Sequence, residues 1–122
     1  MPLNRNNPTD KKSLAEFSSL VDFILPKGYI EFMSSSNGAE GQLSSTYFVL
    51  WPIEDLFSLN KEYHVDEFAP GFFIIGSDGG DTAFAIDKET GELYEMPFIG
   101  MSREEATLRA KDFSGLLETL ER

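Results

Sequence analysis

The chain has 122 residues, of which 41% are hydrophobic and 25% are charged, and this composition predicts one globular domain. It contains no cysteine, which excludes disulfides and thiolate metal sites, and its net charge is −11. Most of that charge lies in residues 62–122, which carry fourteen acids and five bases, so binding to nucleic acid or to an anionic membrane is not expected.

The beginning of the chain predicts two helices. Residues 1–9 are polar and are expected to form a flexible arm, followed by a single domain over residues 10–122. Asp10 is expected to cap the first helix, and Pro26 to open a second helix that ends at Asn37-Gly38. The first helix is expected to bury the apolar residues that recur at helical spacing, namely Leu14, Phe17, Leu20, Val21 and Ile24.

A strand and a third helix are expected next. Residues 46–51 are rich in aromatic and β-branched side chains, which predicts a strand. Pro52 is expected at the first position of a helix whose apolar face consists of Ile53, Leu56 and Phe57. Residues 60–70 are polar and predict a loop, in which Phe68 is expected to turn into the core.

The second half of the chain predicts mainly strands. Phe72–Ile75, Thr82–Ile86 and Leu93–Pro97 are separated by short turns, which requires antiparallel pairing. Residues 98–104 predict a loop, and residues 105–111 fit a helix or a strand. A short terminal helix is indicated by Phe113, Leu116, Leu117 and Leu120. This order predicts an α+β fold with helices packed on one face of an antiparallel sheet.

No combination of residues indicates catalysis. His64 is the single histidine and lies in a charged segment, and no Gly-x-Ser-x-Gly motif is present. Residues 78–81, Asp-Gly-Gly-Asp, lack the spacing of a calcium or phosphate loop and predict a turn capped by Asp78. We therefore expect no enzyme activity, metal or cofactor. A carboxylate enzyme with a divalent metal at Asp78, Asp81 and Asp87 is one remaining alternative.

Acidic residues are the candidate contacts to a protein partner. A basic partner is favoured because complementary charge speeds association, although acidity can also serve solubility alone. Aromatic residues among the acids, such as Tyr63 and Tyr94, could anchor an interface or belong to the core. The candidate partner-binding residues are Glu62, Asp66, Glu67, Asp78, Asp81, Glu92 and Glu95.

Several motifs occur together in a characteristic order. They are Leu25-Pro26-x-x-Tyr29-x-x-Phe32 before Asn37-Gly38, Trp51-Pro52-Ile53-Glu54-Asp55-Leu56 with Asn60 after it, the run from Pro70 to Gly80, Phe84-Ala85-Ile86-Asp87, and Asp112-Phe113-x-x-x-Leu117. In this order they resemble the SMI1/KNR4 family of the SUKH superfamily, over residues 12–121. Asp81 departs from the family pattern, where a third glycine is frequent.

The resemblance implies a central antiparallel sheet of about six strands with about four helices. It also implies a binding protein, because many small bacterial members are immunity proteins that neutralise toxins, often nucleases. Our leading hypothesis is therefore a cytoplasmic immunity protein that contacts a basic toxin domain through its acidic surface. The alternative is a regulatory interaction module of the same family. The polar N-terminal residues, which do not resemble a signal peptide, agree with the cytoplasm.

Overall fold

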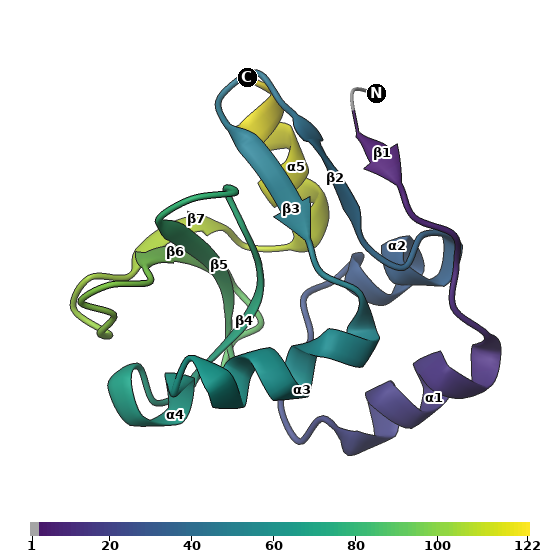
Figure 1. Ribbon diagram of the computed structural model, residues 1–122, viewed down its shortest axis with the longest axis horizontal. Helices are drawn as coiled ribbons and strands as arrows, with labels where there is room; N and C mark the ends of the chain where they lie inside the picture. Colours follow the sequence, from purple (N-terminus) through teal and green to yellow (C-terminus); the bar gives the residue numbers. More distant parts are fainter. Residues whose placement is uncertain (1–2) are drawn as a thin grey trace.

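The computed structural model describes residues 3–122 and, within them, seven strands form one antiparallel sheet in which each strand pairs with the next in the chain (Figure 1). The strands are β1 Asn4–Arg5, β2 Ala39–Gln42, β3 Tyr47–Leu50, β4 Phe72–Ser77, β5 Thr82–Asp87, β6 Leu93–Pro97 and β7 Thr107–Ala110. The helices are α1 Lys11–Leu20, α2 Tyr29–Ser35, α3 Ile53–Glu62, α4 Val65–Phe68 and α5 Phe113–Glu121. The predicted α+β fold is confirmed, and β7 settles the ambiguity over residues 105–111.

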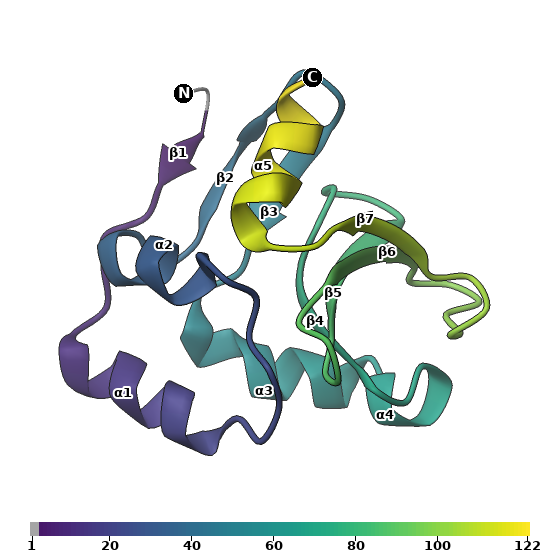
Figure 2. The ribbon, with the colours of Figure 1, turned by 180° about the vertical axis from the view of Figure 1, so that it is seen from behind.

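The larger apolar core lies on one face of the sheet, where α1, α2, α3 and α5 contribute side chains. In Figure 2, α2 and α5 lie in front of β2 and β3. Alternate residues of the strands point into this core, so that Phe73 and Ile75 of β4 lie beside Phe84 and Ile86 of β5. The prediction that the helices pack mainly on one face is therefore confirmed.

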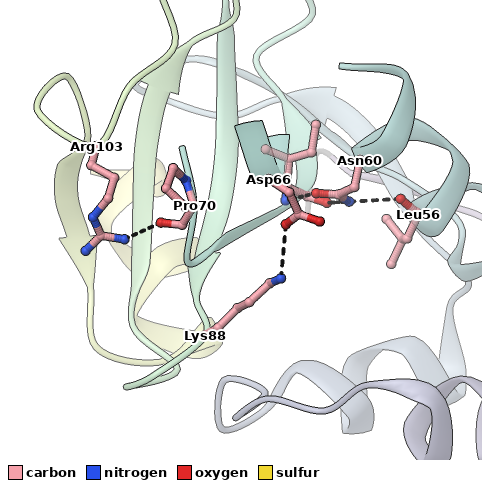
Figure 3. A network of polar contacts seen from close by, with 7 residues as sticks. Leu56, Asn60, Asp66, Pro70, Lys88 and Arg103 are labelled. Atoms are coloured by element: carbon pink, nitrogen blue, oxygen red, sulfur yellow. Dashed lines mark hydrogen bonds and ion pairs between the residues drawn. The ribbon is translucent and has the colours of Figure 1, made fainter. Parts of the chain in front are cut away.

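A smaller core lies on the opposite face of the sheet. The intervening residues of β4, Phe72 and Ile74, pack there beneath Val65 of α4 and Met101 of the 98–106 loop. Arg103 fastens this loop, because its guanidinium donates to the Pro70 carbonyl at 2.6 Å (Figure 3) and lies 4.9 Å from the Phe72 ring centroid. Because side chains pack against both faces of β4, its residues are almost all apolar and do not alternate with polar ones.

Two of the predicted helix starts are wrong. Pro26 lies before α2, which begins at Tyr29. Pro26 instead begins a turn, in which the Tyr29 N–H donates to the Pro26 carbonyl and Gly28 has a φ of +92°. Pro52 is the N-cap of α3 and not its first residue. By contrast, Asp10 caps α1 as predicted, accepting a hydrogen bond of 2.7 Å from the Ser13 N–H.

Three apolar residues expected in the core are exposed. The helix α1 ends at Leu20, which is 68% exposed, and Ile24 beyond it is 53% exposed. The predicted loop over residues 60–70 is wrong, because α3 continues to Glu62 and α4 follows. Phe68, at the end of α4, is 51% exposed and not in the core.

The short strand β1 lies within the expected N-terminal arm. Asn4 pairs with Glu40 of β2, the Asn6 N–H donates to the Gly38 carbonyl at 3.0 Å, and Leu3 is buried. Met1 and Pro2 lie outside the described residues. The predicted flexibility of residues 1–9 stays a prediction. Among residues 3–122, none of the helices combines the length and the apolar character needed to cross a bilayer.

The side chain of Asn60 joins α3 to the backbone of β4. Its Oδ1 accepts from the Ile74 N–H at 2.8 Å, and its Nδ2 donates to the Ile74 carbonyl at 2.9 Å and to the Leu56 carbonyl at 2.8 Å (Figure 3). The pairing of β3 with β4 covers only Val49↔Ser77 and Leu50↔Gly76. The Asn60 amide therefore takes the place of a neighbouring strand beyond the end of β3.

Gly76 allows the close approach of β3 to β4. A Cβ atom at this position would collide with the carbonyl oxygen of Val49 and would lie 3.3 Å from the Cα of Leu50. Both neighbours are backbone atoms, which cannot rotate away as a side chain can. Any larger residue would therefore push the two strands apart where Leu50 pairs with Gly76.

We predict that Asn60→Ala lowers the free energy of unfolding by about 2–3 kcal/mol, because it leaves the N–H and carbonyl of Ile74 without partners. Denaturant unfolding followed by circular dichroism measures this loss. The control is Ser58→Ala on the same helix, whose exposed hydroxyl bonds only to the Asp55 carbonyl and whose removal should change stability by less than about 0.5 kcal/mol. Equal effects of the two substitutions would contradict the role of Asn60.

We predict that Gly76→Ala costs about 3 kcal/mol or prevents folding, because the added methyl group overpacks the β3–β4 pairing. The matched control is Gly80→Ala in the following turn, where the nearest atom to a new Cβ is Asp78 Oδ1 at 3.6 Å. That variant should remain within about 0.5 kcal/mol of the parent chain. Thermal unfolding of both variants is the measurement, and a tolerated Gly76→Ala would show that the strands can separate at this point.

Candidate protein-interaction surface

The candidate partner-binding acids do not form one cluster. Asp66 and Glu67 lie on α4 and line one cleft, whereas Asp78 and Glu95 line a separate polar pocket. The six residues of β4 lie between α4 and the turn that holds Asp78, a span of about 20 Å. Four of the acids are exposed and three are half-buried: Glu62, Asp66, Glu67 and Asp81 in the first group, Asp78, Glu92 and Glu95 in the second.

Asp78 has a structural role in the β4–β5 turn. Its Oδ1 accepts from the Gly80 N–H at 2.8 Å and from the Thr82 N–H at 3.2 Å, as the turn prediction required. Asp87 is at the other end of β5 and caps the next turn through the Glu89 N–H. The carboxylates of the metal-enzyme alternative are therefore not brought together, and no metal-binding group of three side chains occurs in residues 3–122.

One cleft in the described part of the chain has a volume of about 520 Å³. Four parts of the chain form its walls: the end of α1 and the residues just after it, the second half of α3, α4, and the β5–β6 turn. Phe73 of β4 and Asn60 of α3 form part of its lining. The same amide that fixes α3 to β4 therefore also fixes two walls of the cleft relative to each other.

Aromatic rings give the cleft an apolar lining. Phe57 has ring centroids of Phe17 and Phe73 at 5.6 and 5.7 Å, and the Phe23 ring lies 4.9 Å from that of Phe73. Phe57 is nevertheless 43% exposed, and Leu20 beside it is also exposed. Rigid aromatic surface that stays accessible is typical of the residues that contribute most to protein–protein binding.

Charged side chains surround this apolar lining. Lys88 Nζ lies 3.4 Å from Asp66 Oδ1 (Figure 3) and 5.5 Å from the Phe23 ring centroid, so the Lys88 side chain reaches from the β5–β6 turn to α4. Glu67 and Asp22 add carboxylates that have no ammonium partner within ion-pair distance in the described residues, apart from the contact of Glu67 with His64 at 3.9 Å. Asp22 and Glu67 are exposed, so their carboxylates are available to a partner.

His64 shapes the junction between α3 and α4. Its φ of +56° is the only positive φ at a residue other than glycine in the described chain. The His64 N–H donates to the Lys61 carbonyl at 3.1 Å, and its own carbonyl accepts from the N–H groups of Glu67 and Phe68. This left-handed residue reverses the chain and places Asp66 and Glu67 on the cleft. The imidazole is exposed.

A shallower groove of about 200 Å³ continues the cleft between α1 and α3. Leu20 and Phe57 line both hollows, so the two share a boundary. Glu54, at the far end of this groove, accepts from Asn37 Nδ2 at 2.6 Å and from the Thr9 hydroxyl at 2.9 Å. Asn37 also caps α3, because its Oδ1 accepts from the Ile53 N–H.

Sequence reasoning missed the apolar part of this surface. Leu20 and Phe57 fit the helical spacing of core residues, and that pattern does not distinguish a buried position from one at the edge of a helix face. The width of the apolar stripe on α3 could have indicated that Phe57 is accessible. Ile53 and Leu56 are buried at the centre of the stripe, and Phe57 lies at its edge.

We predict a pH-dependent contribution of Glu54 to stability. The hydrogen bond from Asn37 holds the pKa of Glu54 below its ordinary value of 4.5. The carboxylate therefore stabilises the fold above pH 4.5, and this contribution is lost as the pH falls through the lower folded-state pKa. Glu54→Gln should be less stable than the parent at pH 7, and the difference should shrink toward pH 3. Glu118→Gln on α5 is the control, and a difference that does not vary with pH would contradict the prediction.

Comparison with known proteins agrees with this picture. The model of the SMI1 / KNR4 family (SUKH-1) matches residues 8–119, which is nearly the whole chain. None of the curated proteins that were compared with the chain matches it. The match confirms the resemblance carried by the sequence motifs, and the seven-stranded antiparallel sheet with its helices is consistent with the family's α+β arrangement. The chain therefore belongs to the SMI1/KNR4 family (SUKH-1), which includes immunity proteins and whose members bind partner proteins.

Proposed function

We propose that this chain is a bacterial immunity-type protein that binds a cognate toxin, of the nuclease class, and neutralises it by contact in the cytoplasm. The observation that carries the proposal is the family match over residues 8–119 in a chain of net charge −11. A nuclease binds phosphates with clustered Lys and Arg, and an acidic protein can cover such a surface. Complementary charge also speeds the encounter, which matters when a toxin must be stopped before it acts.

Inhibition by contact needs no catalytic group. The proposal accordingly gives no residue of this chain a chemical step, a metal or a cofactor, and it gives the surface residues the work of recognition. The candidate acids Glu62, Asp66 and Glu67 lie near exposed aromatic side chains around α4, a mixture suited to a protein interface. Asp78, Asp81, Glu92 and Glu95 would extend the negative field over the rest of the sheet.

The alternative function is a regulatory interaction module of the same family. The cleft beside α4 would serve it equally well, because an accessible aromatic lining supports binding to any protein of matching shape and charge. The two functions differ in their partner. An immunity protein has a toxin encoded beside it, whereas a regulatory module binds a protein of the host cell's own processes.

Co-expression with the toxin domain encoded next to this chain tests the proposal. We predict that the chain restores growth to cells that produce the toxin, and that it forms a stable complex with a catalytically inactive form of that toxin. Association should slow markedly when ionic strength rises from 0.15 M toward 1 M, since the Debye length falls from about 8 to about 3 Å. Failure to rescue growth together with failure to form a complex would contradict the proposal.

A further inference from the structure

We propose that the cleft between the end of α1, α3 and α4 is the docking site for a basic, amphipathic segment of a protein partner. An apolar side chain of that segment would enter beside Leu20 and Phe57, and its Lys or Arg side chains would face Asp22 and Glu67. The inference rests on the proposed function only in taking the partner to be a protein with a basic surface.

Exposed apolar side chains gather around the cleft. Leu20 and Phe57 line the cleft, although both expose a large part of their side chains. Ile24 and Phe68 are also exposed, and they directly follow the lining residues Phe23 and Glu67 in the chain. Burying apolar surface contributes about 25 cal/mol of favourable free energy per Å². A partner that covers these accessible side chains would therefore gain binding free energy.

The shape of the cleft and the groove favours a helical segment as the occupant. The cleft of about 520 Å³ and the groove of about 200 Å³ meet at Leu20 and Phe57, which makes an elongated hollow with two compartments. An elongated hollow with an apolar centre accepts a row of side chains from one face of a helix, spaced three and four residues apart. A small ligand would need only one compartment.

The charge of the lining favours a basic segment. The linings of the cleft and the groove together carry five carboxylates, from Glu16, Asp22, Glu54, Asp66 and Glu67, and two ammonium groups, from Lys61 and Lys88. Asp66 already pairs with Lys88, so the excess of three negative charges lies on the remaining residues. Together with a net charge of −11, this excess selects a basic segment and disfavours an acidic one or a second copy of this chain.

Two other exposed apolar side chains lie away from the docking site and provide internal controls. Leu108 lies on the edge strand β7, and Ile99 lies in the 98–106 loop, and neither lines the cleft or the groove. Glu118 on α5 is an exposed carboxylate away from both hollows. Leu108→Asp and Glu118→Gln therefore match Leu20→Asp and Glu67→Gln in chemistry while leaving the docking site intact. All four positions are exposed, so these variants are expected to fold, and circular dichroism checks this.

The experiment uses the full chain labelled with ¹⁵N and two synthetic peptides that share one helical Leu pattern. The first peptide has Lys at its polar positions, and the second has Glu at the same positions. We expect amide shift changes with the Lys peptide at residues 20–24, 57–67 and 88, and none with the Glu peptide. The Kd for the Lys peptide should rise at least about tenfold in Leu20→Asp and about threefold in Glu67→Gln, with no change in Leu108→Asp or Glu118→Gln.

Several results would overturn the inference. They are shift changes spread over all the acidic residues, absence of binding to the Lys peptide, equal binding of both peptides, or an unchanged Kd in Leu20→Asp. Dimerisation of the chain through the cleft, detected by sedimentation velocity, would also overturn it because a second copy would then be the occupant. A toxin that is neutralised equally by the parent chain and by Leu20→Asp would refute the docking site while leaving the immunity function intact. Peptide binding at the cleft without rescue from the toxin would support the docking site and refute the immunity function.

Discussion

The arrangement of this molecule depends on the three hydrogen bonds of the Asn60 amide. The strand β3 ends at Leu50 and the chain leaves the sheet at Pro52, so the backbone of β4 at Ile74 loses its neighbour on that side. Asn60 returns to Ile74 from α3 and satisfies both its N–H and its carbonyl. Because unpaired buried backbone groups are costly, this contact fixes the position of α3 across the sheet and so the position of α4 that follows it.

That anchoring gives the candidate interaction surface its form. With α3 held against β4, Phe57 packs between Phe17 and Phe73 but keeps part of its ring accessible. The left-handed His64 then turns the chain so that the acids of α4 face the same cleft. In the proposed complex, the apolar surface would supply most of the free energy of binding, and the surrounding carboxylates would select a basic partner and speed its approach. A family whose members share a fold but bind partner proteins suits such a division of roles.

The sequence predicted the fold class and most of the sheet, because β3 to β6 are aromatic or β-branched runs bounded by turn residues. The strands β1 and β2 escaped prediction because one has two residues and the other, Ala-Glu-Gly-Gln, has almost no apolar side chains. Pro26 was misassigned because a proline that opens a turn has the same local sequence as one that opens a helix. The acids were identified by type, but sequence could not show that β4 separates Asp66 from Asp78 or that Leu20 stays exposed.

Hydrogen–deuterium exchange of the chain, free and bound to an inactive toxin domain, tests the account of the binding surface most directly. The account predicts slower exchange on binding in residues 20–24, 57–68 and 88, which border the cleft. It predicts no change in the 98–106 loop or in the β4–β5 turn around Asp78. Slower exchange confined to either of those segments, with the cleft unaffected, would contradict the assignment of partner binding to the surface that Asn60 holds in place.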